Sequence, residues 1–109
     1  MPLFAADRAT DATGQDRLVV SGDVDLATAH EFVAAADACL ASGAGGPLLL
    51  DLSDVTFIDS TGISALLEIR RAATNAGTDV VVVRQSAVVD RVLALAGITD
   101  LFEVRPAGE

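Results

Sequence analysis

One stretch of the chain, residues 48–63, constrains the fold more than any other. It begins with Leu48-Leu49-Leu50-Asp51-Leu52, the apolar pattern of a strand buried on both faces of a parallel sheet. It ends in Asp59-Ser60-Thr61-Gly62, after which apolar residues recur at helical spacing from Ile63 to Ala73. The stretch therefore predicts a strand that leads into a helix, with two hydroxyl side chains at the junction. Open α/β sheets carry functional residues at such junctions, so we expect a functional site at residues 59–62.

The remaining segments predict a sheet with helices packed on it. Strands are expected at residues 3–6, 17–21, 79–83 and 101–104, and helices at residues 26–41, 61–76 and 87–96. This order predicts an α/β fold: a mostly parallel sheet of four to five strands, with an antiparallel edge strand and helices packed on it. The first helix starts at either Asp25 or Thr28. Its expected inward face is Leu26, Ala29, Phe32 or Val33, Ala36 and Leu40.

Glycine, proline and small polar residues predict the connections. Residues 11–16 are expected to form a turn, Ser53-Asp54 a turn after the strand that ends at Leu52, and residues 105–109 a frayed tail. Residues 42–46 resemble a phosphate-binding loop in glycine content, but they follow a helix, precede a strand, and the sequence contains no lysine. We therefore expect a plain connection there.

Length and charge limit the classes of function. A chain of 109 residues with 51% hydrophobic residues suits a single domain. The net charge is −9 and the seven basic residues are scattered arginines, which disfavours a nucleic-acid partner or an anionic membrane surface. A protein partner with a basic docking face is compatible with this charge.

The expected compartment and the expected role of the cysteine both follow from simple features of the sequence. The sequence has no apolar run of ~18 residues and no basic amino-terminal region, so neither a membrane span nor a secretory signal is expected and the cytoplasm is the expected compartment. Cys39 is the one cysteine, and we expect it to pack as a small hydrophobic residue rather than to act in redox chemistry. No cofactor is implied.

Residues 59–62 have two interpretations that the residues alone leave open. Ser60 is a favoured helix N-cap, because its oxygen accepts hydrogen bonds from the first turn. Ser60 is also a candidate phosphorylation site, since a helix start tolerates negative charge while the phosphate would change the surface. Gly62 in the first helical turn costs about 1 kcal/mol relative to alanine, which suggests that another surface approaches closely. We expect a larger residue at position 62 to impair docking more than stability.

Two catalytic alternatives are weaker. A serine hydrolase would need glycine two residues before the serine, and that residue is Ile58. The one histidine, His30, would have to serve as the base, and nothing in the sequence brings it to Ser60. Asp51, Asp54 and Asp59 bracket the central strand and raise the alternative of a divalent metal site. A position near the strand end for Asp51 and ordinary turn chemistry for Asp54 explain these residues better.

A second acidic segment is expected to join the same surface. Gly22-Asp23-Val24-Asp25 follows a predicted strand, as Asp59-Ser60 does. In a parallel sheet the carboxyl ends of neighbouring strands meet at one edge. We therefore expect Asp23 and Asp25 to lie on one surface with Ser60.

Taken in order, four segments resemble the STAS domain, and specifically the bacterial anti-sigma factor antagonists (anti-anti-sigma factors). Residues 22–25 are similar to the family's Gly-Glu-Leu-Asp, and residues 50–62 closely match its central signature. Residues 80–86 and 95–102 match the strand, the helix start and the ending that follow. The resemblance covers about residues 17–104.

The resemblance implies a non-enzymatic protein of a partner-switching circuit that regulates transcription, for example in stress responses. An unphosphorylated antagonist binds an anti-sigma factor serine kinase and frees the sigma factor. Phosphorylation at the position of Ser60 blocks binding, and a phosphoserine phosphatase reverses it. Thr61 matches the second hydroxyl and is the less favoured acceptor. Asp23, Asp25, Asp59 and Gly62 are implied as parts of the docking surface.

Two further expectations complete the comparison. The runner-up function within the fold is a STAS scaffold or regulatory subunit of a transporter or signalling complex. The family commonly ends in a further helix, whereas five residues follow Val104 here. We therefore expect part of the sheet to be less covered, or available for a partner or for self-association, and a monomer or weak homodimer.

Overall fold

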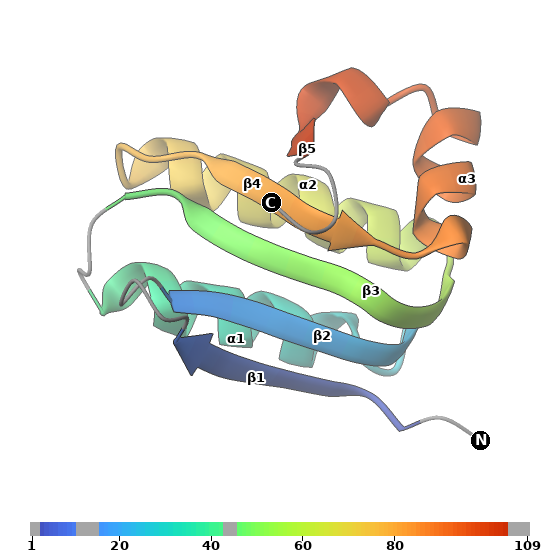
Figure 1. Cartoon of the computed structure of the whole chain (residues 1–109), viewed down its shortest axis with the longest axis horizontal. Helices are drawn as coiled ribbons and strands as arrows, with labels where there is room; N and C mark the ends of the chain where they lie inside the picture. The colour runs from blue at the N-terminus through green and yellow to red at the C-terminus, as the bar shows by residue number, and fades with distance from the viewer. Residues whose placement is uncertain (1–2, 11–15, 43–45, 105–109) are drawn as a thin grey trace.

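A computed structural model describes residues 3–10, 16–42 and 46–104 of the chain, and these form one five-stranded sheet with three helices (Figure 1). The strands are β1 (Ala5–Thr10), β2 (Asp16–Val24), β3 (Leu48–Ile58), β4 (Val80–Gln85) and β5 (Glu103–Val104). They lie in the order β1-β2-β3-β4-β5. The β1–β2 pair is antiparallel and the other pairs are parallel, so the predicted α/β fold with an antiparallel edge strand is confirmed.

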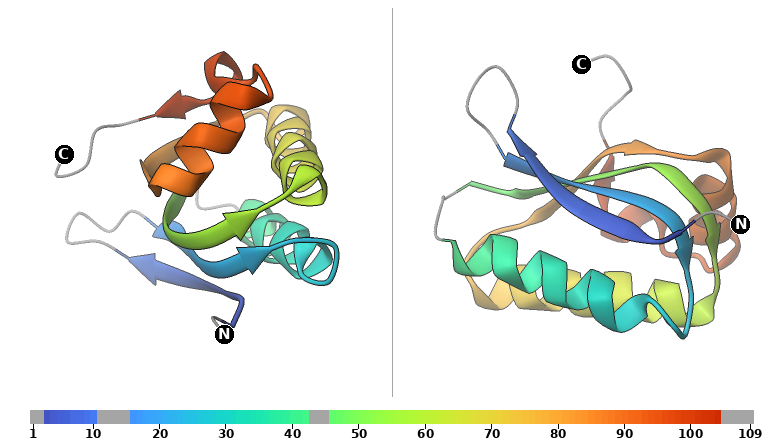
Figure 2. Two further views of the ribbon diagram at one scale, coloured as in Figure 1. Left: turned by 90° about the vertical axis from the view of Figure 1, so that its right-hand side faces the viewer. Right: turned by 90° about the horizontal axis from the view of Figure 1, so that it is seen from below.

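The helices are α1 (Ala29–Ala41), α2 (Ser60–Asn75) and α3 (Ala87–Leu95), followed by a short 3-10 helix, η1 (Thr99–Leu101). Each β-α-β connection advances to the next strand in the same direction, and such crossovers are almost always right-handed. Helices connected in this way collect on one face of the sheet, and Figure 2 shows α1 and α2 side by side beneath it.

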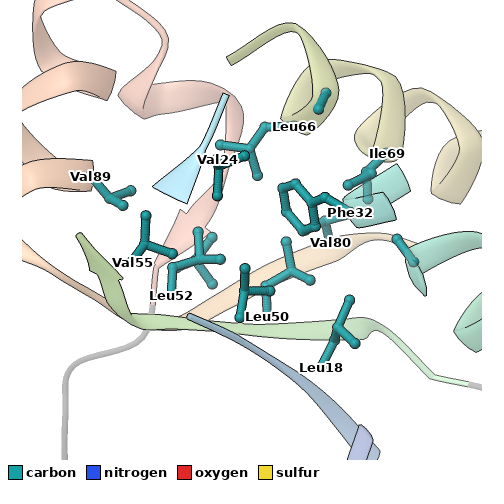
Figure 3. Close-up of a cluster of buried hydrophobic side chains, with 14 of the residues drawn as sticks. Leu18, Val24, Phe32, Leu50, Leu52, Val55, Leu66, Ile69, Val80 and Val89 are labelled. Atoms are coloured by element: carbon teal, nitrogen blue, oxygen red, sulfur yellow. The ribbon is translucent and has the colours of Figure 1, made fainter. Parts of the chain in front are cut away.

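The main core lies between that face of the sheet and the helices. Alternate residues of β3 and β4, including Leu50, Leu52 and Val82, point into it together with Phe32 of α1 and Ile69 of α2 (Figure 3). Val89 and Leu93 bring α3 into the same core. The intervening residues Leu49, Val81 and Val83 are also buried and form a second, smaller cluster. Because successive strand residues point to opposite faces, this cluster lies on the other face of the sheet.

The central strand is longer than predicted. β3 continues to Ile58, so the expected turn at Ser53-Asp54 is wrong. The register against β2 shifts twice, between Val19 and Ser21 and again between Gly22 and Asp23, which places two bulges in β3. At the first bulge the Asp51 carboxylate accepts hydrogen bonds from the Ser53 backbone N–H (3.0 Å) and hydroxyl (2.6 Å). Short-range hydrogen bonds of this kind form at β-bulges as well as at turns, so the residue pattern alone does not distinguish a bulge from a turn.

The first helix begins later than its periodicity suggests. α1 starts at Ala29, and Leu26 lies in the turn before it with its side chain 80% exposed. The expected inward position of Leu26 is therefore wrong, whereas Ala29, Phe32 and Ala36 are buried as predicted. The strand β1 also lies slightly later than residues 3–6.

The last predicted helix and its caps are confirmed. Ser86 caps α3 by accepting a hydrogen bond from the Val89 backbone N–H (3.3 Å), and Gly97 follows the helix with a φ of 71°. Residues 11–15 of the predicted turn, most of the glycine-rich connection and the tail at residues 105–109 lie outside the described residues, while Asp16 already belongs to β2.

Candidate functional site

The junction of β3 and α2 is capped by Asp59, and Ser60 is the first residue of the helix. The Asp59 Oδ1 atom accepts hydrogen bonds from the backbone N–H groups of Thr61 (2.9 Å) and Gly62 (3.1 Å). The interpretation of Ser60 as the N-cap is therefore wrong. Both residues are good caps, and the extended backbone of Asp59 (φ −114°, ψ −169°) gives the role to Asp59.

This arrangement leaves the Ser60 hydroxyl on the surface. Ser60 is exposed, while Thr61 is partly buried. Among the described residues, no hydrogen bond involves the Ser60 side chain, and the cap is complete without it. Of the two hydroxyl residues, Ser60 is therefore the more accessible.

Gly62 is required by the fold itself. A Cβ atom at this position would lie 2.6 Å from the Val24 carbonyl oxygen and 2.6 Å from Ile58 Cγ1. The close surface suggested by this glycine is thus the end of β2 in the same chain. The structure reverses the expectation for a larger residue at position 62, because the clash is internal and affects stability first.

The two acidic segments meet at one edge of the sheet. The register pairs Asp23 with Phe57 and Val24 with Ile58, and the Asp59 backbone N–H donates to the Val24 carbonyl (3.3 Å). The turn after β2 and the start of α2 therefore lie side by side, as Figure 2 shows in its left view. We call the residues 23–28 and 54–64 at this end of the sheet the serine edge.

The carboxylates of the serine edge also hold its backbone together. Asp23 Oδ1 accepts a hydrogen bond from the Thr56 hydroxyl (2.9 Å), which ties β2 to the second bulge of β3. Asp25 Oδ1 accepts from the Ala27 backbone N–H (3.0 Å). The Thr28 hydroxyl donates to the Asp23 carbonyl (2.7 Å). The internal roles of Asp23, Thr56 and Thr28 were not apparent from the sequence, although Asp and Thr side chains commonly form such local hydrogen bonds to the backbone.

The structure gives no support to the hydrolase alternative. His30 lies on the exposed side of α1, and no hydrogen bond between described residues joins it to Ser60. Ser60 itself is at a helix start capped by Asp59 rather than on a strained turn, since no residue other than glycine has a positive φ in the described segments.

The remaining sequence candidates have structural roles. Asp51 holds the first β3 bulge and Asp59 caps α2, while Asp54 is exposed. No group of three or more His, Cys, Asp or Glu residues lies close enough to hold a metal ion in the part of the chain that is described. Cys39 is partly buried against the main core, as expected of a small hydrophobic residue. Over the same residues, no helix is long and apolar enough to cross a membrane.

Comparison with known proteins identifies the family. Residues 8–104 match the family model described as "Mlab, STAS domain". The chain belongs to the STAS domain family. The match begins inside β1 and ends with β5, so it includes at least part of every strand of the sheet of this STAS domain.

Solved structures of similar fold are anti-sigma factor antagonists. An anti-sigma factor antagonist from Mycobacterium paratuberculosis superposes with a TM-score of 0.77 at 26% identity, covering 99% of this chain and 88% of that one. SpoIIAA in its unphosphorylated form gives 0.73 at 16% identity, covering 94% and 90%. The phosphorylated form of Bacillus SpoIIAA gives 0.63 at 16% identity, covering 96% and 93%. The last two identities are low enough that they show the fold alone.

Proposed function

We propose that this STAS domain is an anti-sigma factor antagonist that binds an anti-sigma factor serine kinase through the serine edge. The unmodified domain would hold the kinase and release a sigma factor, and so would regulate transcription from the cytoplasm. Phosphorylation of Ser60 would end the binding, and a phosphoserine phosphatase would restore it. The domain itself would act by binding and not by catalysis.

One observation carries the proposal: Ser60 is exposed at a helix start where the N–H groups of Thr61 and Gly62 already have an acceptor. A phosphate at a helix N-terminus normally gains hydrogen bonds from the first N–H groups. Here the Asp59 carboxylate accepts from two of them, those of Thr61 and Gly62. A phosphate on Ser60 would therefore stay at the surface, beside a carboxylate, without a need for the fold to rearrange.

The expected energetic effect is large enough for a switch. A phosphate adds about two negative charges, and burial of such a group in an interface without a cation is strongly unfavourable. A loss of about 4 kcal/mol corresponds to roughly a thousandfold weaker binding. Similarity to an anti-sigma factor antagonist at 26% identity over almost the whole chain supports the choice of partner.

The experiment is a comparative pull-down from the native lysate with wild type, Ser60→Asp and Asn75→Asp as baits, followed by mass spectrometry. Asn75 is exposed at the other end of α2, so Asn75→Asp adds the same charge away from the serine edge. We expect wild type and Asn75→Asp to retain an ATP-binding kinase that Ser60→Asp loses. Recovery of the same proteins by all three baits would refute the switch. In that case the alternative, a scaffold or regulatory subunit of a transporter or signalling complex, would be favoured.

A second step tests the acceptor. Incubation of the captured kinase with ATP and wild-type domain is expected to add one phosphate, located at Ser60 by peptide mass spectrometry. Ser60→Ala is expected to remain unmodified and to bind the kinase constitutively. Modification of the Ser60→Ala variant at Thr61 would show that the acceptor is wrongly assigned.

A further inference from the structure

Two large apolar side chains are exposed on the serine edge. Leu26 is 80% exposed in the turn between β2 and α1, and Phe57 is 47% exposed near the end of β3. The register of β2 and β3 pairs Phe57 with Asp23, and the turn that carries Leu26 begins two residues after Asp23. Single exposed apolar residues are common on proteins. What distinguishes these two is that both lie in the two adjacent segments that form the serine edge, which also carries Ser60.

The backbone holds Leu26 in its outward position. The turn is closed on one side by the bond from the Ala27 N–H to the Asp25 carboxylate (3.0 Å). On the other side, the Thr28 hydroxyl accepts from the Asp25 N–H (3.0 Å) and donates to the Asp23 carbonyl (2.7 Å). Leu26 lies in the middle of this hydrogen-bonded turn and could not reach the core without breaking it.

Phe57 is held outward in a similar way. Its neighbour Thr56 is fixed by the bond to the Asp23 carboxylate (2.9 Å), and its other neighbour, Ile58, is buried in the main core. The strand therefore directs the Phe57 ring away from the core. An apolar side chain on a rigid backbone loses little freedom on binding, which is a property of side chains that anchor protein interfaces.

Charge indicates the chemistry of the partner. The carboxylates of Asp23, Asp25, Asp54 and Asp59 lie in the same two segments as Leu26 and Phe57. The whole chain carries a net charge of −9. A complementary surface would therefore present apolar pockets bordered by arginine or lysine side chains.

We propose that Leu26 and Phe57 are the anchors of the docking surface, and that the partner receives them in apolar pockets bordered by basic residues. This proposal rests on the proposed function and names the residues that supply the affinity at the same edge. Ser60 would then decide whether docking occurs, while Leu26 and Phe57 supply its strength. The carboxylates would act mainly on the rate of association.

The chain offers matched controls for both anchors. Leu95, at the end of α3, is 81% exposed, and Leu101 in η1 is 43% exposed. Leu95 matches Leu26 in side chain and in exposed fraction, and Leu101 matches Phe57 in exposed fraction with a smaller side chain. Both controls lie outside the serine edge, so the comparison of Leu26 with Leu95 reports position and not hydrophobicity.

The test measures affinity for the purified kinase by calorimetry and rates by surface plasmon resonance. Burial of a leucine or phenylalanine anchor predicts that Leu26→Ala and Phe57→Ala each bind about tenfold or more weakly, mainly through faster dissociation. Leu95→Ala and Leu101→Ala are expected to stay within about twofold of wild type, since truncation away from an interface hotspot has little effect. Equal affinities for the anchor variants and their controls would overturn the proposal. Unchanged melting temperatures check that all four variants are folded.

The basic border of the pockets has its own test. Asp25→Asn keeps an oxygen that can accept the Ala27 N–H bond while it removes the charge. We expect slower association and a weaker dependence of that rate on salt, with dissociation nearly unchanged. An association rate equal to that of wild type at low salt would overturn the assignment of basic residues to the partner.

Ser60→Asp in the same series separates this proposal from the proposed function. Loss of binding by Ser60→Asp with no effect of Leu26→Ala or Phe57→Ala would leave the function standing and overturn the anchors. If Ser60→Asp binds as tightly as wild type while Leu26→Ala and Phe57→Ala bind more weakly, the anchors stand and the proposed switch is overturned. Failure of the wild-type domain to capture a kinase overturns both.

Discussion

Replacement of Gly62 by alanine tests how closely α2 approaches the end of β2. The new Cβ atom would lie 2.6 Å from both the Val24 carbonyl oxygen and Ile58 Cγ1, and 3.0 Å from Val24 Cγ1. The carbonyl belongs to the backbone, so no side-chain rotation relieves that contact. The start of α2 must move away from β2, which also strains the bond from the Asp59 N–H to the same carbonyl.

The magnitude follows from two opposing terms. Overpacking of this kind costs up to about 3 kcal/mol, and alanine recovers about 1 kcal/mol of helix propensity over glycine. The net expected loss of about 2 kcal/mol lowers the melting temperature by about 8–16 °C in a domain of this size. The assay is thermal unfolding followed by circular dichroism, with urea unfolding as the second measure of the free energy of unfolding.

Ser64→Ala is the control, because Ser64 is exposed in the same helix and alanine gains propensity there without a close contact. Its melting temperature is expected to equal or slightly exceed that of wild type. A Gly62→Ala variant as stable as wild type would refute the reasoning, since it would mean that α2 and β2 do not approach as closely as described.

Three further substitutions test the polar contacts around the site, each by the same unfolding measurements. Asp59→Ala removes the cap of α2 and is expected to cost about 0.5–2 kcal/mol, whereas Asp59→Asn keeps an acceptor and should cost much less; equal losses would argue against capping. Asp51→Ala leaves the partly buried N–H of Ser53 at the β3 bulge without its acceptor, at an expected cost of about 1–3 kcal/mol, and full stability would show that the bulge does not depend on this carboxylate. Thr28→Val removes the hydroxyl that bonds the Asp23 carbonyl and is expected to cost about 1 kcal/mol; no loss would show that the turn before α1 does not need it.

Apolar patterning in the sequence predicts most of the fold because much of the central strands β3 and β4 is buried on both faces. Apolar runs such as Leu48–Leu50 and Val80–Val83 have few alternatives to buried strands. Because successive strand residues point to opposite faces of the sheet, the residues of these runs divide between the two buried clusters. The juxtaposition of Asp23 and Asp59 was also predictable, since neighbouring parallel strands end at one edge. These conclusions depend on topology and not on the details of any side chain.

The details that failed depend on local competition or on long-range contacts. Asp59 and Ser60 are both good caps, and only the backbone dihedral angles decide between them. The bulges of β3 interrupt its alternation, so the strand seemed to end at Leu52. Gly62 is explained by Val24, a residue far away in sequence, which no local pattern reveals.

Leu26 shows how one boundary error can conceal an exposed residue, here a proposed anchor. Its spacing from Ala29 suggested an inward position on the helix, but the hydrogen bonds of Asp25 and Thr28 delay the helix start to Ala29. The residue thereby moves from the expected core to the serine edge. Recognition of the Asp25–Thr28 pair as a closed turn would have predicted this exposure.

The most direct test of the proposed switch is the affinity of the purified kinase for the domain with and without a phosphate on Ser60, measured by calorimetry. We expect the unmodified domain to bind and the phosphorylated domain to bind at least about a thousandfold more weakly. Both forms should have the same far-ultraviolet circular dichroism spectrum, since the phosphate stays at the surface. Affinities within about twofold of each other would contradict the account, because the phosphate would then have no effect at the serine edge.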